Sequence, residues 1–557
     1  MRRYHQILLA SAATLQVASA TATFNWDTIT PSRDLVYHDC FDGFKCARLA
    51  VPLDWTNESD NRTTAIAITK LPAVVSDDDP AFGGTMMTNP GGPGASGVEF
   101  VKAFGKSMQG VVDRSGKHFE MFSWDPRGIG QTTPRSDCFN ADVAARNALT
   151  FELRGNGALD LGLNTLEYGL GMNDALAEQC EESDDGHQVM AFVNTRSVVR
   201  DMVEMLDKID ELRKGKSHKR SDDKDVPRLQ YWGFSYGTIL GNYFASLYPG
   251  RVGRIILDGV DNADDYAKGT GWLTNLVDTD KIFDAFWDGC FKAGSSVCAL
   301  ASKNETAEDA KSHFWSWVES LDKRPIRTKS PNGSVMVLKG SDIRVAVAHT
   351  LYQPSPGFKQ LAGILASAMN GNATLLTQGL LGEGELPGLH NDQHPPEAVS
   401  AVACSDGDDV TGKDASFWDN PTGPSRDPSP PPADPKIVAD RPAAPLLFLN
   451  SRLDPVTPLS AARAMAKGHP GSAVVVQESM GHTALINGPS KCTWDIVSEY
   501  LSSGNVPKTE TVCETSCGPW DDNCDPFQLP GEKSLATRGL LSRARSFSGR
   551  RVPFGLL

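Results

Sequence analysis

The chain has 557 residues, of which 40% are hydrophobic and 22% are charged, and its formal net charge is −15. These fractions are close to the averages of globular proteins, which excludes a largely disordered or fibrous chain. The acidic net charge argues against a nucleic-acid-binding protein, because phosphate contacts need a basic face.

The first 22 residues have the features of a signal peptide. Arg2 and Arg3 supply the positive start, residues 7–17 form a short apolar run, and the small residues 18–20 form a cleavage site, although cleavage after Ala22 fits equally. No later stretch has eighteen uninterrupted apolar residues, so no membrane span is expected. The sequence therefore predicts a secreted, extracellular protein.

Two further features fit secretion. The 11 cysteines predict disulfides in an oxidising compartment, and the odd count leaves at least one cysteine outside an intramolecular pair. Closeness in sequence favours the pairs Cys40–Cys46 and Cys290–Cys298, and the remaining connectivity stays open. Asn-x-Ser/Thr sequons predict glycosylation at Asn57, Asn61, Asn304, Asn332 and Asn372.

No metal site and no cofactor are predicted. Cys513, Cys517 and Cys524 lack the paired short spacings and the histidine cluster of a zinc site. His390 and His394 have a spacing that binds metals on a helix, but the prolines that follow them indicate a loop.

Short apolar runs bounded by turn residues predict strands that alternate with helices. Helical patterns lie between these runs, the clearest at 198–212. Such alternation predicts an α/β fold with a mostly parallel central sheet flanked by helices. The predicted strands are 65–71, 84–88, 120–124, 229–232, 254–257, 445–449 and 473–476.

The strand series is interrupted by a long segment with a different pattern. Helical stretches at 281–291 and 306–321 dominate it, and a Pro-rich run at 420–445 closes it as a linker. We interpret this segment as a mainly helical lid inserted before the last two strands. The aromatic residues Phe314, Trp315 and Trp317 are expected in its core rather than in a substrate-binding belt.

The pattern predicts the following organisation along the chain. A charged loop at 214–225 contains Lys219-Arg220, for which we state the hypothesis of a late-secretory processing point. The last residues carry six basic and no acidic side chains from Lys533 onward, and are expected to be disordered. The predicted units are a signal peptide (1–22), a first core segment (23–261), the lid with its linker (262–444), a second core segment (445–530) and a basic tail (531–557).

The strongest local motif is Gly-Phe-Ser-Tyr-Gly at 233–237. It lies between a predicted strand and the apolar helical run 239–247, which is the context of a nucleophile elbow. In such an elbow the glycines permit a tight turn that projects the serine hydroxyl above the sheet. The motif therefore predicts Ser235 as a catalytic nucleophile.

A serine hydroxyl needs a neighbouring base that is itself oriented by a carboxylate. In hydrolases with this elbow the partners follow in the order Ser, acid, His. Asp454 comes directly after a predicted strand, and His482 lies a few residues after the last one. Because both positions are at carboxyl ends of strands, Ser235, Asp454 and His482 are predicted to form a triad.

A glycine-rich loop follows the predicted strand that ends at Thr88. Its sequence, Asn-Pro-Gly-Gly-Pro-Gly at 89–94, lets the backbone approach a reacting carbonyl with free N–H groups. A phosphate-binding loop is disfavoured because no Gly-Lys-Ser/Thr ending is present. We assign the two donors of an oxyanion hole to the N–H groups of Gly92 and Tyr236.

These motifs together resemble the tripeptidyl aminopeptidase/proline iminopeptidase family of α/β-hydrolases. The matching segments are 89–97, 125–130, 233–238 and 248–260, and the closing segment with Asp454 and His482 resembles a tripeptidyl-aminopeptidase-like C-terminal region. Pro90 stands where proline iminopeptidases have a histidine, which favours the tripeptidyl-aminopeptidase branch. The long Pro-rich and charged insertions and the basic tail depart from the compact bacterial pattern of the family, and the sequence as a whole resembles a secreted fungal member.

The resemblance implies the α/β-hydrolase fold and an exopeptidase that cleaves peptides from a free amino terminus. It also implies a carboxylate in the lid for the substrate ammonium, with Glu383, Glu385, Glu397 and Asp406 among the candidates. The alternative is a carboxylic ester hydrolase or lactonase acting on a small secreted metabolite. A third interpretation, an inert hydrolase fold that serves as a binding module, is disfavoured because all three triad candidates are present.

Overall fold

The computed structural model describes residues 24–156, 162–216, 226–268, 271–329, 335–381, 397–419, 442–522 and 524–529. Several predictions from the sequence lie outside these ranges: the signal peptide, the basic tail, most of the Pro-rich linker, the sequon at Asn332, the His390/His394 pair, the Lys219-Arg220 site, and Glu383 and Glu385. No helix among the described residues is long and apolar enough to cross a membrane.

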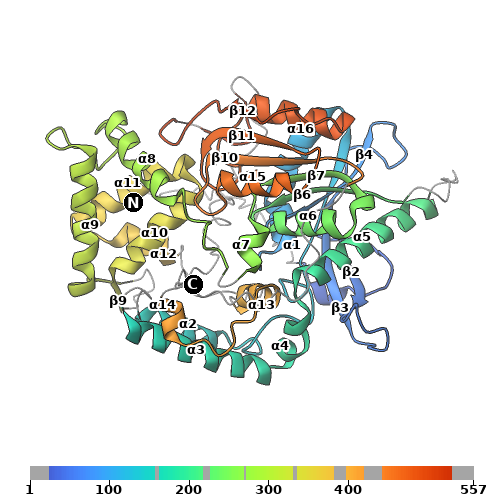
Figure 1. Cartoon of the computed structure of the whole chain (residues 1–557), viewed down its shortest axis with the longest axis horizontal. Coiled ribbons are helices and arrows are strands. Elements are labelled where there is room, and N and C mark those ends of the chain that lie inside the picture. The colour runs from blue at the N-terminus through green and yellow to red at the C-terminus, as the bar shows by residue number, and fades with distance from the viewer. Residues whose placement is uncertain are drawn as a thin grey trace, which may run out of the picture.

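A large mixed sheet forms the centre of the described structure (Figure 1). Its strands lie in the order β1-β2-β3-β5-β4-β6-β7-β10-β11-β12. The pairs at the β1 end, as far as β3–β5, are antiparallel, and every pair from β5 to β12 is parallel. The strands are β1 (His38–Asp39), β2 (Lys45–Pro52), β3 (Thr63–Leu71), β4 (Phe82–Asn89), β5 (His118–Trp124), β6 (Leu229–Phe234), β7 (Val252–Asp258), β10 (Leu446–Leu453), β11 (Ala473–Met480) and β12 (Thr511–Glu514).

This sheet confirms the predicted fold class. Each predicted strand is present and extends one to four residues beyond the predicted run at one or both ends, except that β10 begins one residue later than predicted. β1, β2 and β12 were not predicted from the sequence, and with β12 three strands rather than two follow the lid. β12 has only one buried residue, Cys513, and so lacks the apolar run by which the other strands were found.

Helices cover both faces of the sheet. Adjacent residues of β6 point to opposite faces, and Tyr231 and Trp232 accordingly belong to two different hydrophobic clusters. The cluster around Tyr231 includes apolar residues of α5 (Thr195–Lys216), α6 (Tyr236–Leu247) and α15 (Leu459–Lys467). The cluster around Trp232 includes residues of α1 (Gly97–Val112) and α16 (Lys491–Ser503).

The segment between β7 and β10 forms a mainly helical lid, as predicted. It has its own hydrophobic core, in which Phe283, Trp287 and Phe314 are buried. Trp315 and Trp317 are partly buried against this core. The lid elements are α7 (Ala263–Ala267), α8 (Thr279–Ala293), α9 (Ala307–Lys323), β8 (Ile326–Lys329), β9 (Val335–Leu338), α10 (Gly340–Tyr352), α11 (Pro354–Met369), α12 (Thr374–Leu381), α13 (Glu397–Asp406) and α14 (Ala415–Asp419).

A second helical insertion lies between β5 and α5. It comprises α2 (Val143–Asn156), α3 (Leu163–Glu182) and α4 (Asp184–Val189), and Figure 1 shows these helices beside α13 and α14 of the lid. Arg154 of α2 pairs with Asp342 of the lid at 2.9 Å, and Lys339 donates to the Gly155 carbonyl. The first core segment predicted from the sequence (23–261) includes this insertion, because helical periodicity alone does not tell which partner a helix packs against.

Disulfides tie both the core and the lid. The pairs Cys40–Cys46 and Cys290–Cys298 confirm the prediction from sequence closeness. Three further bridges are present, Cys138–Cys180, Cys492–Cys513 and Cys517–Cys524, so the cysteines considered above as zinc ligands are all bridged. Cys404 is unpaired and exposed.

Candidate active site

Ser235 lies in the sharp turn between β6 and α6. Its backbone has φ 55° and ψ −131°, a conformation that is strained for a non-glycine residue and typical of a nucleophile elbow. The turn is tight enough that a Cβ on Gly233 would lie 2.5 Å from the carbonyl oxygen of Gly237. The Ser235 N–H donates to the Asp258 carbonyl at 3.1 Å, and the Ser235 carbonyl accepts from the Thr238 hydroxyl at 2.6 Å.

Asp454 and His482 meet in direct contact above β10 and β11. Nδ1 of His482 is 3.1 Å from both carboxylate oxygens of Asp454, which is completely buried. The same carboxylate accepts hydrogen bonds from the backbone N–H groups of Val456, Thr457 and Thr483, at 3.0, 2.9 and 3.0 Å. The Asp454 side chain is therefore fixed independently of His482 and orients the imidazole.

The lid also contacts His482. The His482 N–H donates to the Tyr352 carbonyl at 2.8 Å, and the two rings pack edge to face with centroids 5.2 Å apart. Asn487 donates from its side-chain amide to the His482 carbonyl at 2.6 Å. The backbone of His482 is thus held on both sides, by α10 of the lid and by its own loop.

Asp258, the last residue of β7, connects the serine turn to the histidine loop. Its backbone carbonyl accepts from Ser235, and its carboxylate accepts from the N–H groups of Ala484 and Leu485 at 2.5 and 3.1 Å. Among the described residues no hydrogen bond joins the Ser235 hydroxyl to His482. Such catalytic contacts are often long without substrate and tighten on binding.

Several buried carboxylates determine the charge state of the histidine. Burial disfavours the imidazolium, but Asp454, Asp258 and Asp261 outweigh it and raise the pKa of His482 above its ordinary value. Burial raises the pKa of Asp258 and of Asp261 to about 7. His482 is therefore suited to accept a proton, since a charged imidazolium is stabilised by its surroundings.

The glycine-rich loop after β4 lies directly against the serine turn. A Cβ on Gly91, whose φ is +95°, would lie 2.5 Å from the Phe234 carbonyl oxygen and 2.8 Å from the Cβ of Ser235. Only glycine permits this approach. Among the described residues, the N–H groups of Gly92 and Tyr236 donate no hydrogen bond outside their own helix or strand, so both donors are free for a ligand.

Sequence reasoning missed several residues that build this site. Asp258 lies in a segment that carried the family resemblance and Asp261 directly follows it, but nothing in the sequence indicated that they lie near His482. Tyr352 lies on a lid helix without a distinctive motif. The hydroxyl of Thr457 is 3.1 Å from Nδ1 of His482. Its position three residues after Asp454 was the one feature of the sequence that could have indicated its place in the site.

The chain is similar to several known hydrolases. A protein-family profile described as TAP-like protein matches residues 415–513. Serine protease Hip1 of Mycobacterium tuberculosis is 28% identical over 501 residues, which cover 85% of this chain and 87% of the relative. Tripeptidyl aminopeptidase of Streptomyces lividans is 21% identical over 537 residues, covering 91% and 90%. Carboxylesterase B of M. tuberculosis is 25% identical over 496 residues, covering 84% and 86%.

The TAP-like region contains β10 and β11, and with them the Asp454–His482 pair that the structure brings together. The chain has an α/β-hydrolase fold. The predicted TAP-like C-terminal region and the predicted class of enzyme are confirmed. A fungal source stays a prediction.

Proposed function

We propose that this α/β hydrolase is a secreted serine hydrolase that cleaves peptides from a free amino terminus. The observation that carries the proposal is the position of Asp258, whose backbone holds the Ser235 turn and whose side chain holds the loop of His482. Through it the nucleophile and the Asp454–His482 pair lie at the same end of neighbouring parallel strands. This is the end at which open α/β sheets hold their sites.

The roles follow from the contacts. The Ser235 hydroxyl attacks the substrate carbonyl while Nε2 of His482 removes its proton and then returns it to the leaving amine. Asp454 keeps the Nδ1–H tautomer and stabilises the imidazolium. The N–H groups of Gly92 and Tyr236 donate to the oxyanion of the tetrahedral intermediate. The acyl-enzyme is then hydrolysed by the same steps with water, and no cofactor takes part.

Two relatives support a peptide substrate. Their names are serine protease and tripeptidyl aminopeptidase, and their similarity spans most of each chain. The similarity to a carboxylesterase keeps the ester hydrolase as the alternative. Secretion is supported by five disulfides and by the exposure of Asn57, Asn61, Asn304 and Asn372, four of the predicted glycosylation sites.

An aminopeptidase needs a carboxylate that pairs with the substrate ammonium. Of the lid candidates within the described residues, Glu397 pairs with Arg146, and Asp406 accepts from Thr195 and Tyr266. Asp261 fits this role better. It follows β7, lies near enough to His482 to raise the pKa of the imidazole, and accepts one side-chain hydrogen bond, from the Trp272 indole at 3.1 Å.

The proposal is tested with purified protein and its Ser235→Ala variant. A fluorophosphonate should label the wild type and not the variant, and labelling of the variant would place the nucleophile elsewhere. Tripeptidyl and prolyl substrates are then compared with and without an acetyl group on the amino terminus, beside short acyl esters. Acetylation should abolish cleavage, whereas equal cleavage of both forms, or hydrolysis of esters alone, would favour the ester hydrolase.

A further inference from the structure

The lid helix α13 is linked to both segments that carry the proposed oxyanion donors, to one directly and to the other through one side chain. On one side, a Cβ on Gly94 of the glycine-rich loop would lie 3.1 Å from Cγ2 of Val399, so the helix lies against this loop. On the other side, Asp406 at the end of the helix is connected to Tyr236, the residue after Ser235, through the side chain of Thr195. The inference drawn from these contacts rests on the proposed function.

The second contact is a chain of short hydrogen bonds. The Asp406 carboxylate accepts from the Thr195 N–H at 2.7 Å and from the Thr195 hydroxyl at 2.6 Å. The Thr195 hydroxyl oxygen is in turn 2.6 Å from the Tyr236 hydroxyl. Because Thr195 donates its one hydroxyl proton to the carboxylate, Tyr236 is the donor in the last link. Tyr266 also donates to Asp406, at 2.8 Å.

This chain lies inside the protein and ends on a charge. Thr195 is completely buried, and Tyr236 and Tyr266 are each 4% exposed. Hydrogen bonds to a carboxylate are about twice as strong as those between neutral groups, and a low local dielectric strengthens them further. The ring of Tyr236 is therefore held by a charged anchor that belongs to the lid and not to the sheet.

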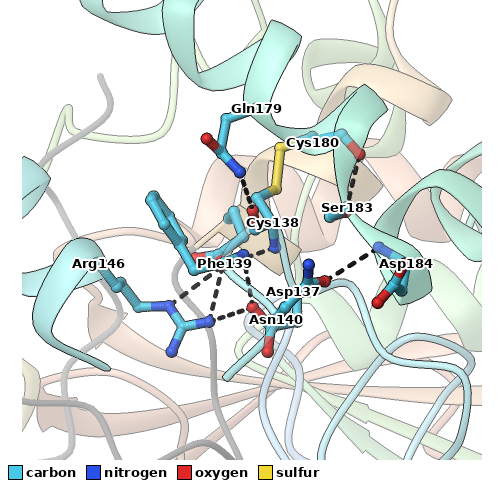
Figure 2. The surroundings of a disulfide bond; sticks show 10 residues. Asp137, Cys138, Phe139, Asn140, Arg146, Gln179, Cys180, Ser183 and Asp184 are labelled. Atoms are coloured by element: carbon cyan, nitrogen blue, oxygen red, sulfur yellow. Dashed lines mark hydrogen bonds and ion pairs between the residues drawn. A yellow bond between two sulfur atoms is a disulfide. The ribbon is translucent and has the colours of Figure 1, made fainter. Parts of the chain in front are cut away.

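The other end of α13 is fixed as well. Arg146 of α2, 1% exposed, donates to Asp137 at 2.5 Å and to Glu397, the first residue of α13, at 3.1 Å. The same Glu397 oxygen accepts from the Cys138 N–H at 3.2 Å. Figure 2 shows Arg146 reaching toward Asp137 beside the Cys138–Cys180 bridge. Both ends of α13 are therefore held by hydrogen bonds and ion pairs, Glu397 at the start and Asp406 at the end.

We propose that Asp406 is a positioning residue of the oxyanion hole. Through Thr195 it fixes Tyr236, whose backbone N–H is the first of α6 and so has no acceptor within the helix. Asp406 touches neither the substrate nor the reacting atoms. Its contribution lies in holding one oxyanion donor in the place that the tetrahedral intermediate requires, since a misplacement of about 1 Å there can lower the rate about 100-fold.

The test compares Asp406→Asn with the wild type in kcat, in KM and in the Ki of a peptide boronic acid, whose adduct with Ser235 places an oxygen in the oxyanion hole. We expect kcat and boronate affinity to fall by the same factor, on the order of ten-fold, with KM unchanged within two-fold. Tyr236→Phe removes the hydroxyl but keeps the backbone N–H and should reproduce this loss. The double variant should be no worse than either single one, because both act on the same chain.

Matched controls separate positioning from stability. Tyr266→Phe removes the other hydroxyl that Asp406 accepts from, and Asp409→Asn changes an exposed carboxylate three residues further along. Both should leave kcat and boronate affinity within two-fold. If Asp406→Asn does not fold, Thr195→Val breaks the same chain while the Thr195 backbone N–H still bonds to Asp406.

The outcomes are distinct for the two proposals. Rates of fluorophosphonate labelling report the serine and its oxyanion hole without any peptide, so a failure of peptide cleavage alone would contradict only the aminopeptidase. A folded Asp406→Asn or Thr195→Val variant with wild-type labelling rate and boronate affinity would overturn the role of Asp406. A wild type that is not labelled would overturn both.

Discussion

Nδ1 of His482 lies equally close, at 3.1 Å, to the two carboxylate oxygens of Asp454, although 28 residues separate them in sequence. The carboxylate accepts hydrogen bonds from three backbone N–H groups that hold it in place, so its position does not depend on the histidine. In the proposed mechanism this contact selects the tautomer whose Nε2 accepts the proton of Ser235.

Asp454→Asn is expected to lower kcat/KM by about 10⁴-fold, because an amide no longer selects the productive tautomer or stabilises the imidazolium. Steady-state kinetics on a free-amino-terminus peptide measure the effect, and a thermal melt reports whether the fold persists. Asp495→Asn, at an exposed carboxylate paired with Lys491, is the control and should retain full activity. A folded Asp454→Asn variant within ten-fold of the wild type would remove Asp454 from the proposed triad.

Gly91→Ala is expected to lower activity by at least about 100-fold, because its methyl group would displace the serine turn that carries an oxyanion donor. The matched control is Gly43→Ala. Gly43 also has a positive φ, +79°, but a Cβ there would meet no atom within 4 Å. Gly43→Ala should therefore lower the free energy of unfolding by about 1–2 kcal/mol through backbone strain alone. This loss would be seen as a lower melting temperature with unchanged kcat. Equal losses of activity in both variants would show that backbone strain at a positive φ, and not the contact of Gly91 with the serine turn, causes the loss.

The sequence predicted this part of the molecule because each element has a local signature. An apolar run of Leu and Phe identifies β10 and a run of Val identifies β11, and the two glycines around Ser235 mark a turn whose geometry requires them. Since the carboxyl ends of parallel strands share one edge of the sheet, Asp454 and His482 could be placed beside Ser235 without knowledge of the strand order.

What was missed depends on packing between segments that are distant in sequence. Arg146 and Glu397 are 251 residues apart, and Thr195 and Asp406 are 211 residues apart. Nothing in the pattern of either partner indicates the other, because a charged residue on an amphipathic helix is usually solvated. The Cys138–Cys180 bridge could not be derived for the same reason, whereas the bridges between near neighbours could.

Asp261→Asn is expected to raise the KM of peptides with a free amino terminus by about ten-fold or more, since the ammonium loses its charged partner in a desolvated site. Acetylated peptides and esters carry no ammonium, so the variant and the wild type should cleave each of them at the same rate. Asp264→Asn, three residues away and exposed, provides the control. An unchanged KM for the free amine would exclude Asp261 as its partner.

The pH dependence of kcat/KM should show an acid limb above the ordinary pKa of histidine. His482 acts as a base only when neutral, and three carboxylates raise its pKa, so activity is lost as pH falls through that raised value. Asp261→Asn removes one of these negative charges, which lowers the pKa of His482 and moves the acid limb to lower pH. The rate of fluorophosphonate labelling, measured as a function of pH, gives the acid limb without a substrate amine. An acid limb that moves to higher pH in the variant would contradict this electrostatic account.

Cys404 should be the one cysteine that reacts in the unreduced protein. The other ten of the 11 cysteines form five bridges, and Cys404 is exposed at the surface of α13. Although the residue is exposed, neighbouring groups partly desolvate its thiol and raise the pKa, so alkylation by iodoacetamide should be slow near neutral pH and faster as pH rises. Peptide mass spectrometry should find one alkylated site before reduction and eleven after it. A second reactive cysteine would contradict the pairing described here, and a reduction-sensitive dimer on a gel would show that Cys404 bridges two copies.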